Sequence, residues 1–446
     1  MKKLTNASGA TLFLIDDVSP EDLAMLQALY SRSAASVETH MAQVYETGSA
    51  RFCEQFMVGY GHKSIADCGS TTMFIEDVSM LAAKAVQDWP LYCGQETSSR
   101  YVDMTQRRIE DPVGTERSKA ILDRWMAFYT STHDRVVEAI RQKYPRRPDE
   151  KEGTYERAVQ ARSFDIRRSF LPAGVTTQLS WHTNLRQAGD HLTYLANHPS
   201  EEIRRVGQGL RALLSEQYPS SGLNESLPSV SGIKKTDGQQ AREAWEQKVA
   251  ASCTYLSTDG PEFTSVVDET ELSKFADLLE TRPRGVVLPH FLSGLGQLTW
   301  RFNLDFGSFR DIQRHRNGVC RMPLLTTAEG FEPWYLDQLD PNLAQTAKDL
   351  IDELTLEILQ VTDDPVARQY YTALGFRVPC QVTYGLPAAV YVMEIRSAKT
   401  VHPTLRRVIH KMIGGFQEVL PQVPLHVDMD EDGWDVRRGN QTIRVK

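Results

Sequence analysis

The sequence predicts an α+β protein built from two domains in tandem. The first observation is that amphipathic stretches at helical spacing alternate with short extended segments. The second is that four sequence elements of the first half recur in the same order in the second half. The third is a polar stretch rich in Ser, Gly and Pro between the two sets. A chain of 446 residues has room for two or three domains.

Apolar residues at helical spacing predict a first helix over residues 21–34, and Pro20 stands where helices begin. Residues 64–87 read as an extended segment followed by a helix that Ser79 caps. A long amphipathic helix is predicted over residues 117–143 and ends at the prolines of KYPRRP. SFLPAGVTTQLSW then reads as extended, and NHPSEEIRRV opens another helix with acidic residues in its first turn.

The second half repeats this order. An apolar-aromatic run again precedes a polar motif, and a long amphipathic helix follows it. GFRVPCQVTYG echoes SFLPAGVTTQLSW, and VHPTLRRV echoes NHPSEEIRRV. We therefore predict a diverged tandem duplication, with domains over residues 1–220 and 261–446 and a linker over 221–260.

Composition is that of an ordinary globular protein, with 41% hydrophobic and 24% charged residues. The net charge of −8 argues against a dedicated binder of long nucleic acid. Six cysteines, in no CxxC pair and at no zinc spacing, indicate reduced thiols in the cytoplasm and predict no metal site. We find no signal-peptide core and no apolar run near the roughly 18 residues of a membrane span, so we expect neither secretion nor membrane insertion.

The stretch GQETSSRY places Glu96, Ser98 and Arg100 two residues apart, so that an extended or turning backbone projects them to one side. A hydroxyl beside a guanidinium suits a phosphate, because Arg supplies a charged two-pronged donor and Ser a short neutral one. The alternative is a solvated polar loop with a helix cap.

A second motif, QRHRNG, holds Arg314, His315 and Arg316. An imidazole between two guanidiniums can stack on or flank a planar anionic cofactor. The alternative is a basic triplet on a solvated face, which is too short for a nucleic-acid patch. Neither a glycine-rich phosphate loop nor a hydrolase nucleophile elbow is present, so function depends on dispersed Arg, His, Ser and Glu side chains.

These residues resemble the signature of the flavin-dependent thymidylate synthases. The family pattern is RHR, seven residues, then Ser, with Glu two positions before the Ser and Arg-Tyr after it. The tail of this pattern stands in the first half as Glu96, Ser98, Arg100 and Tyr101. RHR stands in the second half as Arg314, His315 and Arg316. Each half has lost the part that the other half retains.

Other family landmarks divide in the same way. The first half matches them at Gly61, His62, Ser64, Arg168, Asn184 and Arg186. A later helix Arg of the family stands in the second half as Arg396, where the first half has Leu195. The resemblance covers roughly residues 20–220 and 260–425. It implies two thymidylate-synthase-complementing-protein-like α/β domains in tandem, each a sheet with long helices.

The resemblance also implies an activity, the reductive methylation of dUMP to dTMP. FAD would be the cofactor, with methylenetetrahydrofolate and NADPH as co-substrates. Family sites form between subunits of a homotetramer, so we expect a homodimer of this chain to imitate that tetramer, with composite sites between the two halves. The expected ligand is a small-molecule nucleotide. We expect neither a nucleic-acid polymer nor a membrane as a partner.

Individual roles follow from the resemblance. The implied substrate-binding residues are Ser98, Arg100, Tyr101, Arg168 and Arg396. The implied catalytic residues are Arg396, Ser98 and Glu96, with Arg396 facing a pyrimidine carbonyl as C5 becomes nucleophilic. The implied flavin-binding residues are Ser31, His62, Ser64, Glu96, Asn184, Arg186, Arg314, His315 and Arg316.

One departure concerns Asp311, three residues before RHR, where the family often has Gln. An acidic side chain near a phosphate is unfavourable, so we expect Asp311 to bind a sugar hydroxyl or the substrate to differ. Two alternatives therefore stay open. One is FAD-dependent C5 modification of another pyrimidine nucleotide, and the other is a non-catalytic nucleotide-binding homologue.

Overall fold

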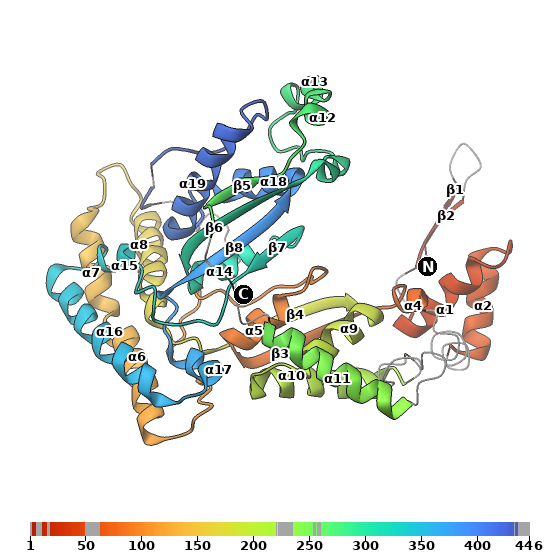
Figure 1. Ribbon diagram of the computed structural model, residues 1–446, viewed down its shortest axis with the longest axis horizontal. Coiled ribbons are helices and arrows are strands. Elements are labelled where there is room, and N and C mark those ends of the chain that lie inside the picture. Colours follow the sequence, from red (N-terminus) through yellow and green to blue (C-terminus); the bar gives the residue numbers. More distant parts are fainter. Residues whose placement is uncertain are drawn as a thin grey trace. The chain divides into compact units, whose positions relative to one another are not determined.

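The computed structural model combines many helices with small β-sheets, which confirms the predicted α+β class (Figure 1). It describes residues 2–5, 11–15, 18–49, 63–219, 221, 235–252, 256, 260–431 and 433–435. The chain divides into two compact units. Unit 1 comprises Met1–Ile75, Leu91–Gln95 and Ser180–Ala251. Unit 2 comprises Glu76–Pro90, Glu96–Leu179 and Ser252–Lys446. The linear domain order over 1–220, 221–260 and 261–446 stays a prediction.

Unit 1 is mainly helical, with one small antiparallel hairpin. The hairpin strands are β1 (Lys2–Thr5) and β2 (Thr11–Leu14). The helices are α1 (Pro20–Tyr30), α2 (Val37–Thr47), α4 (Lys63–Ala66), α9 (Leu185–Leu195), α10 (Glu201–Gln217) and α11 (Lys235–Ser252). Two paired strands cross the division between the units, β3 (Ser70–Ser79) and β4 (Thr176–Asn184).

Unit 2 contains a four-stranded sheet in the order β5-β6-β8-β7. Its strands are β5 (Phe263–Ser265), β6 (Gln297–Asp305), β7 (Gly318–Arg321) and β8 (Arg377–Gly385). The helices of its first part are α5 (Met80–Gln87), α6 (Glu116–Ser131), α7 (His133–Lys143), α8 (Glu152–Arg167) and the 3-10 turn η2 (Arg168–Phe170). Those of its later part are α12 (Glu269–Ser273), α13 (Ala276–Glu280), η3 (His290–Leu295), α14 (Phe306–Gln313), α15 (Pro333–Leu336), α16 (Pro341–Val361), α17 (Pro365–Arg368), η4 (Gln369–Tyr371), α18 (Leu386–Arg396) and α19 (Pro403–Val419).

Strand β8 is central in this sheet and pairs antiparallel with β6 and β7. Every second residue of β8 is buried, because successive side chains of a strand point to opposite faces. The buried members are Val378, Cys380, Val382 and Tyr384. Helices α18 and α19 pack against the sheet beside them (Figure 1), and β8 leads directly into α18.

The long helices of unit 2 follow simple sequence rules. In α16, Pro341 occupies the first turn and Asp340 caps it by accepting the Leu343 backbone N–H. One face of α16 is buried at spacings of three and four residues. Helices α16 and α6 pack together, as do α7 and α8 (Figure 1).

Several helix boundaries differ from the sequence prediction. The helix expected over residues 117–143 is two helices, because the chain turns at Thr132, whose hydroxyl donates to the Phe128 carbonyl at 2.6 Å. The helix expected over 21–34 begins at Pro20, behind the cap Ser19, and ends at Tyr30. The expected cap Ser79 is confirmed, since its Oγ accepts the Ala82 backbone N–H at 3.0 Å. An 18-residue helix, α11, lies within the expected linker.

Two short segments of unit 2 pair about an approximate two-fold axis. Pro172 and Ala373 form an antiparallel bridge, and their numbers differ by 201 (172 and 373). On one side the Ala173 N–H donates to the Thr372 carbonyl at 2.9 Å, and on the other the Leu374 N–H donates to the Leu171 carbonyl at 2.8 Å. A second pair of backbone hydrogen bonds shows the same offset of 201 residues. The Gly174 N–H donates to the Tyr370 carbonyl, and the Gly375 N–H donates to the Ser169 carbonyl.

The elements that follow these segments also match in length. Strands β4 and β8 each have 9 residues, helices α9 and α18 each have 11, and helices α10 and α19 each have 17. This is the pattern that two equivalent halves would produce. The duplication itself stays a prediction.

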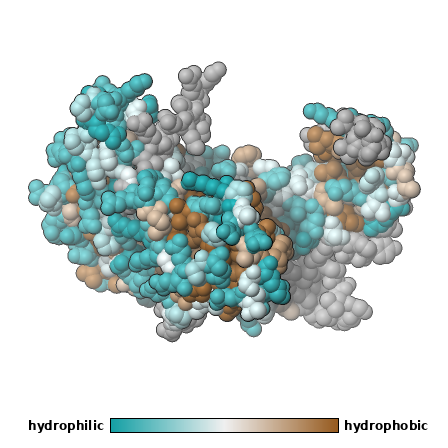
Figure 2. All heavy atoms as spheres, turned by 90° about the horizontal axis from the view of Figure 1, so that it is seen from above, coloured by the Kyte–Doolittle hydropathy of each residue, from teal (hydrophilic) through white to brown (hydrophobic). Residues whose placement is uncertain are grey.

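The surface is mostly hydrophilic in the view of Figure 2, with hydrophobic patches between the polar areas. Tyr391 and Ile395 of α18 are among the large hydrophobic side chains that are exposed. Among the described residues, no helix has the length and hydropathy that crossing a bilayer requires.

Candidate functional site

Helix α14 of unit 2 is the element around which the candidate site is built. Its N-cap is Asp305, whose Oδ2 accepts the Ser308 backbone N–H at 2.9 Å. The Tyr335 hydroxyl donates to the same oxygen at 2.9 Å. Burial raises the pKa of the Asp305 carboxyl, and the Arg168 guanidinium opposes that rise. These contacts fix the first turn of α14 and therefore the position of Asp311 one turn later.

Asp311 lies within a cluster of four arginines. Its Oδ1 forms an ion pair with Arg314 at the C-terminus of the same helix. Burial alone would raise the pKa of the Asp311 carboxyl, but nearby guanidiniums hold it well below its usual range. They belong to Arg314, Arg168, Arg100 and Arg396. We call these five residues the Asp311 cluster.

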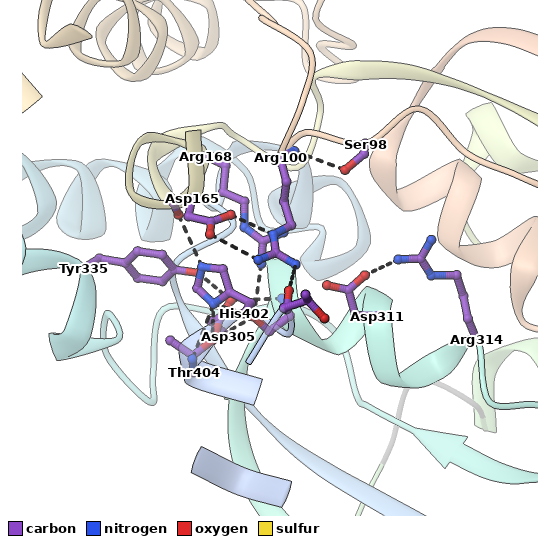
Figure 3. Close-up of polar contacts among 12 residues, drawn as sticks. Ser98, Arg100, Asp165, Arg168, Asp305, Asp311, Arg314, Tyr335, His402 and Thr404 are labelled. Atoms are coloured by element: carbon purple, nitrogen blue, oxygen red, sulfur yellow. Dashed lines mark hydrogen bonds and ion pairs between the residues drawn. The ribbon is translucent and has the colours of Figure 1, made fainter. Parts of the chain in front are cut away.

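Arg100 enters the cluster from the GQETSSRY loop (Figure 3). Its Nε and Nη2 donate to the two oxygens of Asp165 at 2.7 and 3.1 Å, a bidentate pair. Asp165 is 1% exposed, so this pair anchors the loop to buried α8. Ser98 supports the turn, because its Oγ accepts the Arg100 backbone N–H at 3.2 Å. The expected neighbours Ser98 and Arg100 are thus brought together.

Arg168 extends from η2 into the interior and is 3% exposed. One terminal nitrogen donates to the Ser308 hydroxyl at 3.1 Å, whereas the buried Nε has no hydrogen-bond partner. Burial alone would lower the pKa of Arg168, but Tyr335 and the acids Asp311, Asp305 and Asp165 raise it. The guanidinium is therefore fully charged, and its buried Nε–H has no acceptor.

A buried polar network supports Arg168 and Asp165. His402 is fully buried, with Nε2 at 3.3 Å from the Asp165 carbonyl and Nδ1 at 2.9 Å from the Thr404 hydroxyl. Burial and then Arg168 lower the pKa of His402 well below its usual value, so the ring is neutral. Because a carbonyl can only accept, the ring proton sits on Nε2 and Nδ1 accepts from Thr404.

Arg396, at the end of α18, contacts α14 in two ways. One terminal nitrogen donates to the Asp311 backbone carbonyl at 3.0 Å, and Nε donates to His315 Nε2 at 2.6 Å. Burial, then Arg396 and Arg314, lowers the pKa of His315 to about 3. His315 is therefore a neutral acceptor for Arg396. The ring of Tyr391 lies 6.1 Å from that of His315 between centroids.

Glu96 is held inside unit 2. Its two oxygens accept from Gln87 at 2.7 Å and from Arg310 of α14. The side chains of Glu96 and Arg310 are 5% and 9% exposed. The ion pair ties the GQETSSRY loop to α14. Of the other expected residues in this unit, Tyr101 is exposed and Arg316 is half-buried.

The remaining expected flavin residues lie in unit 1, where α4 packs against α1 and α9. Asn184 caps α9 by accepting the Gln187 backbone N–H at 2.8 Å, and Arg186 donates to Asp67 at 2.7 Å. Ser31 is the C-cap of α1, and Ser64 is exposed on α4. Gly61 and His62 lie outside the described residues.

Sequence reasoning brought Arg100, Arg168, Arg314 and Arg396 to attention, and the structure gathers these four in unit 2. It did not identify the partners that hold them. The direct partners are Asp165 for Arg100 and Ser308 for Arg168, and the supporting residues behind them include Tyr335 and His402. Sequence reasoning also did not identify Arg310, the partner of Glu96. The only sequence signals for these residues were the position of Asp165 three residues before Arg168 and the repeated His-Pro pair that contains His402. Guanidiniums surround Asp311, and the expectation that it binds a sugar hydroxyl stays a prediction.

The comparison with known families bears on the first half of the chain. The sequence model of the family described as thymidylate synthase complementing protein matches residues 14–220. Its name suggests a thymidylate-synthase-related theme. The match supports the expected relationship at this coarse level.

Curated relatives extend along most of the chain. The UPF0159 protein Ta1429 of Thermoplasma acidophilum is 23% identical over 90% of this chain and 94% of its own length. A UPF0159 protein of Chlamydia muridarum is 23% identical over 81% of this chain and 77% of its own. A UPF0159 protein of Chlamydia pneumoniae is 21% identical over 89% of this chain and 84% of its own length. These names state no activity.

Proposed function

We propose that this protein is an FAD-dependent enzyme that reductively methylates dUMP to dTMP with methylenetetrahydrofolate and NADPH. The similarity of residues 14–220 to the thymidylate synthase complementing family supports the thymidylate theme. The single observation that carries the proposal is the Asp311 cluster. Arg100 and Arg168 come from the half with the Ser-x-Arg-Tyr tail, and Arg314 and Arg396 from the half with RHR.

The cluster has the chemistry that a nucleotide monophosphate needs. A phosphate dianion binds best to guanidiniums that are charged and held in place. Arg100 is held by Asp165 through two of its nitrogens, and the third makes only a long contact of 3.5 Å with the Thr400 carbonyl, which a phosphate oxygen can replace. Arg168 contributes a buried Nε that has no hydrogen-bond partner. We therefore assign Arg100, Arg168 and Ser98 to the phosphate.

Arg396 is the residue that we assign to the pyrimidine. Its guanidinium is fixed by the Asp311 carbonyl and by His315. A fixed cation beside a pyrimidine carbonyl stabilises the negative charge that develops as C5 becomes nucleophilic. His315 contributes by accepting the Nε–H of Arg396 while it stays neutral itself.

The residues of the RHR motif fit a flavin. Arg314 keeps 41% of its side chain exposed, and its ion pair with Asp311 uses one terminal nitrogen. Such a donor suits a diphosphate, and the neutral His315 ring suits a planar neighbour. Bound flavin would supply the hydride and carry the carbon from the folate. For the residues of unit 1, flavin binding stays what the resemblance implies; they are Ser31, Ser64, Asn184 and Arg186.

Glu96 has a positioning role in this proposal, since Gln87 and Arg310 occupy both of its oxygens. We keep the homodimer as the proposed assembly, because the resemblance implies sites that are completed between subunits. Size determination in solution tests it, and a monomer at working concentrations would contradict it.

The decisive experiment is turnover by the purified full-length chain. The chain is supplied with dUMP, methylenetetrahydrofolate, FAD and NADPH, and dTMP is measured by chromatography. Retained flavin is read from its visible absorbance. We expect dTMP from the wild type and a loss of about 100-fold or more in Arg396→Gln, the order observed when one transition-state donor is removed.

The matched control is Arg407→Gln. Arg407 is an exposed arginine of α19 whose nearest ion-pair distance, to Glu332, is 3.9 Å. It should keep wild-type turnover. The protein could also be yellow, yield no dTMP and modify another pyrimidine nucleotide from a panel of dCMP, UMP and CMP. In that case the modified nucleotide, and not dUMP, would be the substrate. A protein that retains no flavin and converts none of them would contradict the proposal.

A further inference from the structure

The charge arrangement at the Asp311 cluster leads to an inference about a residue that the proposed chemistry does not use. The cluster holds four guanidiniums, and one carboxylate, Asp311, lies among them. Of the two other buried acids, Asp165 is engaged in its bidentate pair with Arg100, and Asp305 caps α14 and accepts from Tyr335. Asp311 is thus the acid that the remaining guanidiniums share.

We propose that Asp311 is a built-in counter-anion that holds the place of a ligand's anionic group, so that a phosphate binds by competing with its carboxylate for the surrounding arginines. Only the identity of the phosphate, as that of a nucleotide, rests on the proposed function. The chemical class of the ligand group is a tetrahedral dianion.

The first support is the geometry of the acid. Asp311 lies one helical turn after Ser308, which binds Arg168, and three residues before its ion-pair partner Arg314. Arg396 donates to its backbone carbonyl at 3.0 Å. In Figure 3 the Asp311 carboxylate points toward the Arg100 and Arg168 side chains on one side, and its ion pair with Arg314 lies on the other.

The second support is what the arginines lack. The Nε of Arg168 is buried without a hydrogen-bond partner, although Arg168 is 3% exposed. A buried unmatched donor on a charged group is costly, so a ligand oxygen that accepted from this Nε would gain a hydrogen bond that the free protein does not make. Arg314, by contrast, keeps 41% of its side chain exposed and can exchange its acid for a ligand oxygen.

Two consequences follow from elementary electrostatics. Without a ligand, Asp311 offsets the mutual repulsion of the arginines and stabilises the fold. With a dianion bound, the same carboxylate repels it and weakens binding. Charges separated by a few ångströms near a protein surface interact by several kcal/mol, so both effects should be measurable.

The test uses the full-length chain and inorganic phosphate as the probe. Asp311→Asn keeps the size of the side chain and removes its charge. We expect this variant to melt at a lower temperature than wild type without phosphate, to gain more from added phosphate, and to bind phosphate roughly tenfold more tightly. Chloride at the same ionic strength serves as the reference in each titration.

The matched control is Asp428→Asn, which removes an acid from another buried arginine of unit 2. Asp428 pairs with Arg406 at 3.2 Å, and Arg406 also donates to the Ser397 and Asp430 carbonyls. This variant should lose stability and keep the wild-type response to phosphate. A residue that is only structural would give that same result at position 311.

The outcomes decide the inference. Unchanged or weaker phosphate binding by Asp311→Asn would overturn it. Asp311→Asn could be unfolded without phosphate. In that case we expect added phosphate to restore its circular dichroism, and a variant that stays unfolded in phosphate would contradict the proposal. Phosphate carries no pyrimidine, so tighter binding without any dTMP formation would sustain this inference while the proposed function fails.

Discussion

Arg396 donates its Nε–H to Nε2 of His315 at 2.6 Å, across 81 positions of sequence. The sequence assigned these residues to different ligands, Arg396 to the nucleotide and His315 to the flavin. If these two roles were independent, Arg396→Ala would leave flavin retention intact and a His315 variant would weaken it. Because the two side chains touch, their effects on ligand binding should be coupled.

The first prediction is therefore a double-mutant cycle on dUMP affinity. We expect Arg396→Gln and His315→Ala to be non-additive, with a coupling energy of about 1 kcal/mol or more, because removing either one frees the other. Equilibrium binding of dUMP to the wild type, both single variants and the double variant measures it. Strict additivity would show that the contact does not organise the site.

The pair of Arg100 with Asp165 gives a second prediction. Asp165→Asn should destabilise the protein by about 2 kcal/mol and weaken dUMP binding about tenfold, because it breaks a buried bidentate ion pair and releases Arg100. Urea unfolding and equilibrium binding measure the two effects. The exposed pair of Lys119 and Asp123 supplies the control, and Asp123→Asn should change stability by less than about 0.5 kcal/mol.

The third prediction concerns pH. The pKa of His315 is lowered to about 3 from an ordinary value of 6.5. Between these values the unfolded chain binds a proton at this residue and the folded chain does not, so its contribution to stability falls as the pH falls below 6.5. Urea unfolding at pH 7.5, 6 and 5 should show a smaller loss of stability in His315→Gln than in wild type. Equal losses would mean that His315 protonates freely in the folded protein.

The two-fold pairing at Pro172 and Ala373 supports a fourth prediction, on stability. A Cβ at Gly174 would lie 2.6 Å from the Glu110 carbonyl oxygen and 3.0 Å from that of Tyr370, both of them backbone atoms. Gly174→Ala should therefore destabilise the protein by about 2 kcal/mol or more. Gly414 of α19 has nothing within 4 Å of the same position, so Gly414→Ala should be neutral or stabilising by about 0.5 kcal/mol. Thermal unfolding of both variants compares them.

A fifth prediction is stoichiometry. If the halves are equivalent, the positions of Asp311 and Arg396 correspond to Ala85 and Leu195 in the first half, which carry no charge. The position of Arg168 corresponds to Gln369, whose side chain accepts the Leu325 backbone N–H at 2.9 Å and donates to the Val366 carbonyl at 3.2 Å. Calorimetric titration should give one dUMP per chain. Two equivalent sites per chain would show that the second position also binds.

Sequence reasoning located the arginines of the cluster because permanently charged side chains at fixed spacing carry a strong local signal. Ser79 as a cap and the extended segment behind it were found for a similar reason, since capping and strand patterns are local. The break at Thr132 was missed, because a helix interior tolerates Thr in most settings and only the observed turn distinguishes it.

The partners of the arginines could not be predicted, because they depend on contacts between distant segments. Asp165 meets Arg100 across 65 positions, and His402 reaches the Asp165 carbonyl across 237. No periodicity or spacing contains these contacts. The surroundings of Asp311 could not be predicted for the same reason, because three of its four neighbouring guanidiniums come from other segments.

The central claim is that residues from both halves bind a single nucleotide. Equilibrium binding of dUMP to Arg100→Gln, Arg396→Gln and the control Arg407→Gln tests it directly. We expect about tenfold or greater loss of affinity in each of the first two variants and wild-type affinity in the third. Wild-type affinity in either Arg100→Gln or Arg396→Gln would contradict it.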